Sequence, residues 1–174
     1  MKAGMLGLCL IFLMACSLTQ PARVVDEADF RFTLPPGWRL MSELWENYTP
    51  GNDYKHLGVA EIVSVTSVQK KGEYGVWFTV AQREFSGSDL RAELDQLYRQ
   101  TEPSIPDFTL SEAEIGGYAG YVVTYRRPWG EPWWEFQDYW VVKGGRVYLL
   151  SFEALKLDEY AEEMQLIRDS FVWK

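Results

Sequence analysis

Four strand-like segments follow one another in the second half of the chain, and this succession constrains the fold more than any other feature. Each segment is rich in β-branched and aromatic residues, and short glycine- or proline-containing stretches separate them. The segments are residues 108–115, 118–127, 133–143 and 146–154, and the connections are Gly116-Gly117, residues 128–132 and Gly144-Gly145. Because connections this short favour antiparallel pairing, we expect a four-strand meander.

The preceding residues predict further strands and helices around this meander. Alternation of Phe30, Phe32 and Leu34 predicts a strand, and the apolar spacing from Met41 to Tyr48 predicts a short helix. The remaining expected elements are a short strand at 38–40, a hairpin of 59–68 and 76–85, a helix near 88–101 capped by Ser86 or Ser88, and a helix from Asp158 to 170. This order predicts an α+β fold, with one antiparallel sheet and helices packed on it.

Residues 1–15 are typical of a secretory signal peptide. Lys2 supplies a positive start, and an uninterrupted apolar run extends from Met5 to Ala15. This run is shorter than the roughly 20 residues that a membrane-spanning helix needs. Cys9 lies inside the leader, so the mature chain would keep only Cys16 and no intramolecular disulfide is expected.

The end of the leader, Leu13-Met14-Ala15-Cys16, resembles the lipobox of bacterial lipoproteins. The resemblance implies that the Cys16 thiol is acylated with a lipid and that the peptide is cut just before it. The alternative is an ordinary signal peptide with an incidental cysteine. A lone exposed thiol would be a liability in an oxidising compartment, whereas an acylated one is not.

These observations predict three segments and a location. We expect a signal peptide at 1–15, the acylated Cys16 with an irregular tether at 16–29, and a single domain at 30–174. The formal net charge of −8 without a basic patch argues against nucleic-acid binding and against attraction to anionic headgroups. Lipid on Cys16 would therefore hold the chain in the cell envelope, on the outer face of the cytoplasmic membrane or on the outer membrane, and both remain open.

The predicted domain resembles the PsbP-like fold, which is shared with DcrB-type bacterial lipoproteins. Three stretches carry the resemblance, and together they span the domain: residues 30–38, with Pro35-Pro36-Gly37-Trp38, the turn from Gly116 to Gly120, and the closing helix that ends at Ser170-Phe171. The resemblance implies an α/β/α sandwich and an accessory role at a membrane. It brings no catalytic residues.

The sequence contains no pattern that is typical of a catalytic or metal site. His56 is the sole histidine, and the nucleophile elbow, phosphate loop and dinucleotide fingerprint are all missing. Glu131, Glu135 and Asp138 lie within eight residues, and paired carboxylates could act on a glycosidic bond. In an acid-rich chain a solvated face is the preferred interpretation. We predict no enzyme activity, no cofactor and no metal.

The densest unusual feature is residues 126–134, which we call the aromatic turn. Trp129 lies between two prolines in the turn itself, and a tryptophan exposed at a rigid turn suits a sugar, a peptide or a lipid interface. The expected contact residues are Trp129, Trp133, Glu131, Arg126 and Arg127. The alternative is that Trp129 folds back over the hairpin and covers its own core.

Two functions follow as hypotheses. The first is a non-catalytic, membrane-anchored accessory lipoprotein that binds a protein or another envelope component. The second is a ligand-binding module for a glycan or small molecule, with the aromatic turn as its platform. A concave pocket at the turn would favour the ligand, and a flat apolar patch would favour a protein partner.

Overall fold

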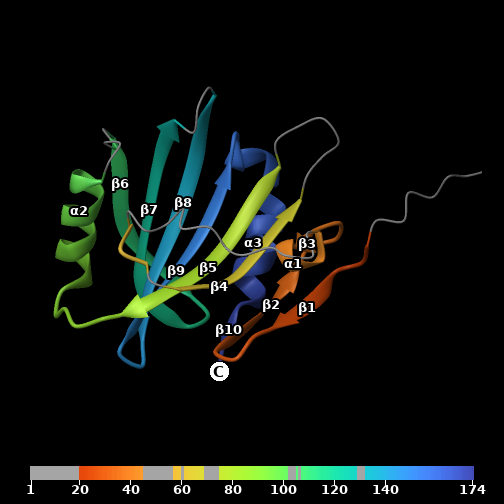
Figure 1. The fold of residues 1–174 in the computed structure, drawn as a ribbon, viewed down its shortest axis with the longest axis horizontal. Coiled ribbons are helices and arrows are strands. Elements are labelled where there is room, and N and C mark those ends of the chain that lie inside the picture. The colour runs from red at the N-terminus through yellow and green to blue at the C-terminus, as the bar shows by residue number, and fades with distance from the viewer. Residues whose placement is uncertain are drawn as a thin grey trace, which may run out of the picture.

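The computed structural model describes residues 20–44, 57–59, 61–68, 75–101, 105, 107–128 and 132–174. Its largest element is a seven-stranded sheet in which every neighbouring pair of strands is antiparallel (Figure 1). In spatial order its strands are β3 (Arg39–Leu40), β4 (Glu61–Val68), β5 (Val76–Glu84), β9 (Arg146–Ala154), β8 (Trp133–Lys143), β7 (Tyr118–Pro128) and β6 (Phe108–Ile115). The predicted meander is β6 to β9, and the predicted hairpin is β4 and β5.

Pairs of glycines form two of the turns in the meander. Ile115 pairs with Tyr118, and Lys143 pairs with Arg146, so each loop holds two residues. Gly116 and Gly117 have φ of 59° and 82°, and Gly144 and Gly145 have φ of 59° and 79°. The favoured two-residue hairpin turn requires positive φ at both positions, which only glycine adopts without strain. The sequence pattern thus determines these two loops locally.

One face of the large sheet is covered by a second, three-stranded sheet and by the last helix. The small sheet has the order β1 (Arg23–Asp26), β2 (Phe30–Leu34) and β10 (Val172–Trp173). The 3₁₀ turn η2 (Leu157–Tyr160) leads into α3 (Ala161–Ser170), which lies behind the central strands in Figure 1. Phe30, Phe32 and Phe171 stack in this core, and Ile167 is fully buried beside them.

The opposite face is covered by α2 (Leu90–Gln100), which buries Leu94 and Tyr98 against the sheet. Asp89 caps this helix, because its side-chain oxygen accepts a hydrogen bond from the amide of Ala92 at 3.0 Å. Layers on both faces make the domain an α/β/α sandwich, which confirms the predicted α+β class. The helix α1 (Met41–Leu44) begins as expected, while Trp45 and Tyr48 lie outside the described residues.

The structure corrects three expectations and adds one strand. The strands form two sheets rather than one, because β2 pairs with β1 and β10 instead of joining the meander. Residues 23–26, expected within the tether, form β1 and pair with residues 31–34. The cap of α2 is Asp89 rather than Ser86 or Ser88. The two-residue strand β10 was not predicted, because two residues show no alternation.

Candidate functional site

The register of the β7–β8 hairpin divides the predicted contact residues between the two faces of the sheet. Arg126 pairs with Glu135 and Pro128 pairs with Trp133, so these four side chains share the face that carries α3. Arg127 pairs with Trp134 on the face that carries α2. The structure therefore brings Arg126 and Trp133 together and separates Arg127 from them.

The tip of the aromatic turn, with Trp129 and Glu131, lies outside the described residues. Trp133 is described, and its side chain is 45% exposed at the start of β8. Its neighbour Trp134 is buried on the opposite face, as the alternation of the strand predicts. Trp133 thus presents an indole ring to solvent on the same side of the sheet as Arg126.

A concave surface that includes Glu135, two positions along β8 from Trp133, lies between the β7–β8 hairpin and the elements η2 and α3. We call it the hairpin groove, and its volume is about 430 Å³. Strand side chains form one wall and helix side chains form the other. The lining residues are Thr124, Tyr125, Arg126, Glu135, Phe136, Gln137, Leu157, Asp158, Ala161, Met164 and Arg168. Its size falls within the range of small-ligand pockets.

Glu135 connects the two walls of the hairpin groove. One carboxylate oxygen accepts a hydrogen bond from the amide of Leu157 at 2.9 Å, which satisfies a free N–H at the start of η2. The other oxygen lies 3.9 Å from Nε of Arg126. Because that guanidinium is 65% exposed and only loosely paired, it keeps donors available for a bound molecule.

Arg168 supplies a second guanidinium from the helical wall. Its Nη1 donates a hydrogen bond to the hydroxyl of Tyr139 at 2.7 Å, and its Cζ lies 5.8 Å from the centroid of that ring. No carboxylate in the described part of the chain forms an ion pair with Arg168, and its buried Nε has no hydrogen-bond partner there. The helical period could have placed Arg168 on the sheet-facing side of α3, because it lies four positions after the buried Met164.

These contacts define what the hairpin groove can do chemically. Two guanidinium groups offer hydrogen bonds and positive charge to a carboxylate, a phosphate or a hydroxyl-rich molecule. The lining also carries the carboxylates of Glu135 and Asp158, which can accept hydrogen bonds from a bound molecule. These donors and acceptors suit the groove to binding a polar molecule, and Trp133 adds an exposed aromatic ring on the same face of the sheet.

The other acid of the predicted carboxylate group lies on the opposite face. Asp138 is fully buried beneath α2, where it accepts hydrogen bonds from Ser151 at 2.5 Å, Tyr98 at 2.5 Å and Tyr125 at 3.0 Å. Burial raises the pKa of Asp138 to about 6, while these hydrogen bonds oppose the rise. Glu135 and Asp138 thus point away from each other and cannot act as a pair.

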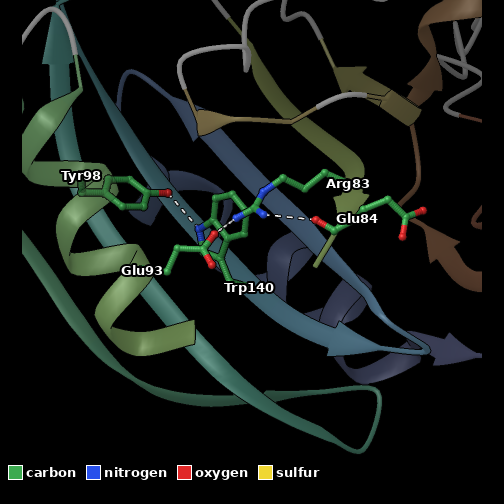
Figure 2. Close-up of polar contacts among 5 residues, drawn as sticks. All are labelled: Arg83, Glu84, Glu93, Tyr98 and Trp140. Atoms are coloured by element: carbon green, nitrogen blue, oxygen red, sulfur yellow. Dashed lines mark hydrogen bonds and ion pairs between the residues drawn. The ribbon is translucent and has the colours of Figure 1, made fainter. Parts of the chain in front are cut away.

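Figure 2 shows two polar contacts that attach α2 to the sheet. The indole Nε1 of Trp140 donates to the hydroxyl of Tyr98 at 2.9 Å, and Tyr98 in turn donates to Asp138. At the other end of the helix, Glu93 forms an ion pair with Arg83 of β5. These polar contacts are a fixed part of the fold, since α2 and the four strands β5, β7, β8 and β9 contribute to them.

The described part of the chain contains neither a metal-binding cluster nor a membrane-spanning helix. No three acidic, histidine or cysteine side chains among them gather closely enough to hold a metal ion. In the same part of the chain, no helix has the length and apolar character that crossing a bilayer requires.

The layers and topology define the class of the domain as a PsbP-like α+β fold. The crystal structure of LpqN, described as involved in cell envelope biogenesis of Mycobacterium tuberculosis, superposes with a TM-score of 0.56 over 88% of this chain and 90% of LpqN, at 12% identity. The solution structure of the cyanobacterial PsbP, CyanoP, from Synechocystis sp. PCC 6803 gives 0.55 over 88% and 92%, at 11% identity. No protein-family model and no curated protein sequence matches the chain.

Proposed function

We propose that the chain is a non-catalytic accessory lipoprotein of the cell envelope, whose domain binds a protein or another envelope component through the hairpin groove and the aromatic turn. The observation that carries the proposal is the gathering of Arg126, Glu135 and Arg168 in one groove beside the exposed Trp133. The envelope-associated description of LpqN, which shares the fold, supports the location.

The proposed lipid anchor limits the distance between the domain and the membrane. If Cys16 carries the lipid, only residues 17–22 separate it from β1, because β1 begins at Arg23. At roughly 3.6 Å per residue, this stretch reaches at most about 25 Å. The small three-stranded sheet would then lie closest to the membrane.

Replacing Cys16 by serine tests the anchor. Serine cannot accept the thioether-linked lipid, so we expect an uncut precursor or a protein released from the membrane fraction. Fractionation and intact-mass measurement in the native host give the result, and Cys9→Ser is the matched control because Cys9 lies inside the leader. An unmodified Cys16 in the mature wild-type protein would contradict the proposal.

Site-specific crosslinking tests the binding surface. Benzoylphenylalanine in place of Trp133 should capture a partner in native membranes, since this position is 45% exposed beside the hairpin groove. The control is Tyr118, an aromatic residue that is 39% exposed at the other end of β7. A shared adduct at both positions, or none at position 133, would contradict a binding site at the groove.

A glycan or small molecule is the second candidate for the same groove. The concave shape favours it, because the groove has a small-ligand volume and guanidinium donors from both walls. The mass of the adduct at position 133 separates the two candidates, since a protein partner adds tens of kilodaltons. An adduct of small mass that is sensitive to glycosidases would establish the second candidate.

A further inference from the structure

The strand β6 ends the seven-stranded sheet on the side away from β3. It is eight residues long, and in the described part of the chain only β7 pairs with it. Among the described residues, its outer edge therefore presents backbone N–H and C=O groups that no other strand pairs with. In Figure 1 this edge lies next to α2.

A second groove, which we call the β6 groove, lies between this edge strand and α2. Its volume is about 430 Å³, and β6 contributes Phe108 and Leu110, both half-buried. The helix contributes Asp89, Arg91, Ala92, Asp95 and Arg99. Cζ of Arg99 lies 5.5 Å from the centroid of the Phe108 ring, so the helix is positioned alongside the strand. An edge strand with a helix across a groove is an arrangement that receives extended peptides, because the edge binds the main chain and the groove binds alternate side chains.

The charge of β6 indicates which peptide fits. Glu112 and Glu114 continue the side of the strand that carries Leu110, and both are exposed. Neither forms an ion pair within the described residues, whereas Asp95 in the β6 groove is paired with Arg99 at 2.8 Å. Side chains alternate between the two faces of β6, so Phe108, Leu110, Glu112 and Glu114 share the groove side. This side is apolar near Phe108 and acidic near Glu114.

The same acids disfavour a second copy of this chain as the occupant. Two-fold antiparallel pairing of two β6 strands centred on Ser111 places Glu112 of one copy diagonally across from Glu112 of the other, and pairing centred on Glu112 places them directly opposite. Like charges at either position repel. A basic segment would instead meet two unpaired carboxylates. The charge of β6 therefore favours pairing with a basic strand and disfavours pairing with an acidic one.

We propose that β6 binds an extended segment of a partner protein by strand addition. The bound segment carries apolar side chains opposite Phe108 and Leu110, and lysine or arginine opposite Glu112 and Glu114. This surface lies on the α2 side of the domain and is separate from the hairpin groove, so the proposal stands independently of the function proposed above.

A synthetic peptide tests the proposal directly. For antiparallel addition the probe is Lys-Thr-Lys-Thr-Val-Thr-Val-Thr with a fluorophore, titrated into the full chain and followed by anisotropy. We expect saturable binding, and about tenfold weaker binding when glutamate replaces both lysines. Equal binding of the two peptides, or binding of neither, would overturn the proposal.

Two N-methylated forms of the probe distinguish strand addition from side-chain adhesion. In an added strand, every second N–H of the peptide points toward β6 and the others point away from it. Methylation of the first set blocks the hydrogen bonds to β6, whereas methylation of the second set leaves them intact. One form should lose at least about tenfold in affinity while the other stays within about twofold of the parent. An equal loss in both forms, or no loss in either, would contradict strand addition.

Charge reversal on the protein completes the test. Glu112→Lys should weaken binding of the lysine probe about fivefold, whereas Glu162→Lys, an equal change of charge on an exposed site of α3, should leave it unchanged. Sedimentation of the wild-type chain is measured alongside. A dimer that the probe does not dissociate would assign the edge to a second copy and overturn the proposal.

Discussion

Replacing Trp140 by alanine should lower the free energy of unfolding by about 3–5 kcal/mol, the range for emptying a well-packed aromatic site. The indole has no exposed surface, and it packs in the core between α2 and the sheet. The change also removes the hydrogen bond from Nε1 to Tyr98, which attaches α2 to the strands. Urea denaturation followed by circular dichroism measures the loss.

Two further variants separate volume from hydrogen bonding. Trp140→Phe keeps most of the apolar contact but loses the hydrogen bond, so we expect a smaller loss than with alanine. Trp133→Ala removes the same side chain from an exposed position, and its effect should stay below about 0.5 kcal/mol. A loss below about 1 kcal/mol for Trp140→Ala would show that the core beneath α2 is not packed as described.

The buried Asp138 should make the protein less stable as the pH rises from about 4 to about 6. Its pKa is about 6 in the folded state and ordinarily 3.8, so the folded chain binds more protons than the unfolded chain in this interval. Stability is therefore lost as the carboxyl ionises. The difference in pKa corresponds to about 3 kcal/mol, complete above pH 6.

Asp138→Asn isolates this contribution, because the amide keeps the shape but does not ionise. Other acids act in the opposite direction, since Arg99 lowers the pKa of Asp95 and Arg23 lowers that of Glu43. Subtracting the stability of the variant from that of the wild type at each pH removes these shared effects. We expect the difference to change by about 3 kcal/mol between pH 3.5 and pH 7.5. A difference that is constant over this range would contradict the raised pKa.

The sequence predicts those parts of the fold that local chemistry determines. Two-residue glycine turns at 116–117 and 144–145 require the φ values found, and the strands on either side pair antiparallel as expected. The buried stripe of the last helix, with Met164 and Ile167, follows from the helical period. Leu94 and Tyr98 are buried in α2 for the same reason.

The parts that the sequence does not predict depend on distant partners. In β1 only Val25 is buried, so the strand shows too little alternation to be recognised without β2 beside it. The assignment of β2 to a separate sheet depends on β10, about 140 residues later. Short strands of this kind are stable only through non-local pairing, which a local pattern does not contain.

The candidate site, like the fold, is predicted from the sequence only where local pattern determines it. Strand alternation correctly places Trp134 away from Trp133 and Glu135, because their side chains alternate along β8. It does not reveal that Arg126 and Arg168 line one groove, since 42 positions of chain separate β7 from the relevant turn of α3. Asp138 interrupts an apolar face in the sequence, and only the hydroxyl groups of Tyr98, Tyr125 and Ser151 explain why it is tolerated there.

The pairing of β10 with β2 joins the two ends of the domain, and this sets the order in which the chain can complete its fold. Trp173 pairs with Phe30, and Phe171 packs on Phe32 in the core beneath α3. Because synthesis proceeds from the amino end, this core cannot be completed before residues 171–173 have left the ribosome. The amino-terminal strands β1 and β2 therefore remain without part of their core until the segment that follows α3 has been made.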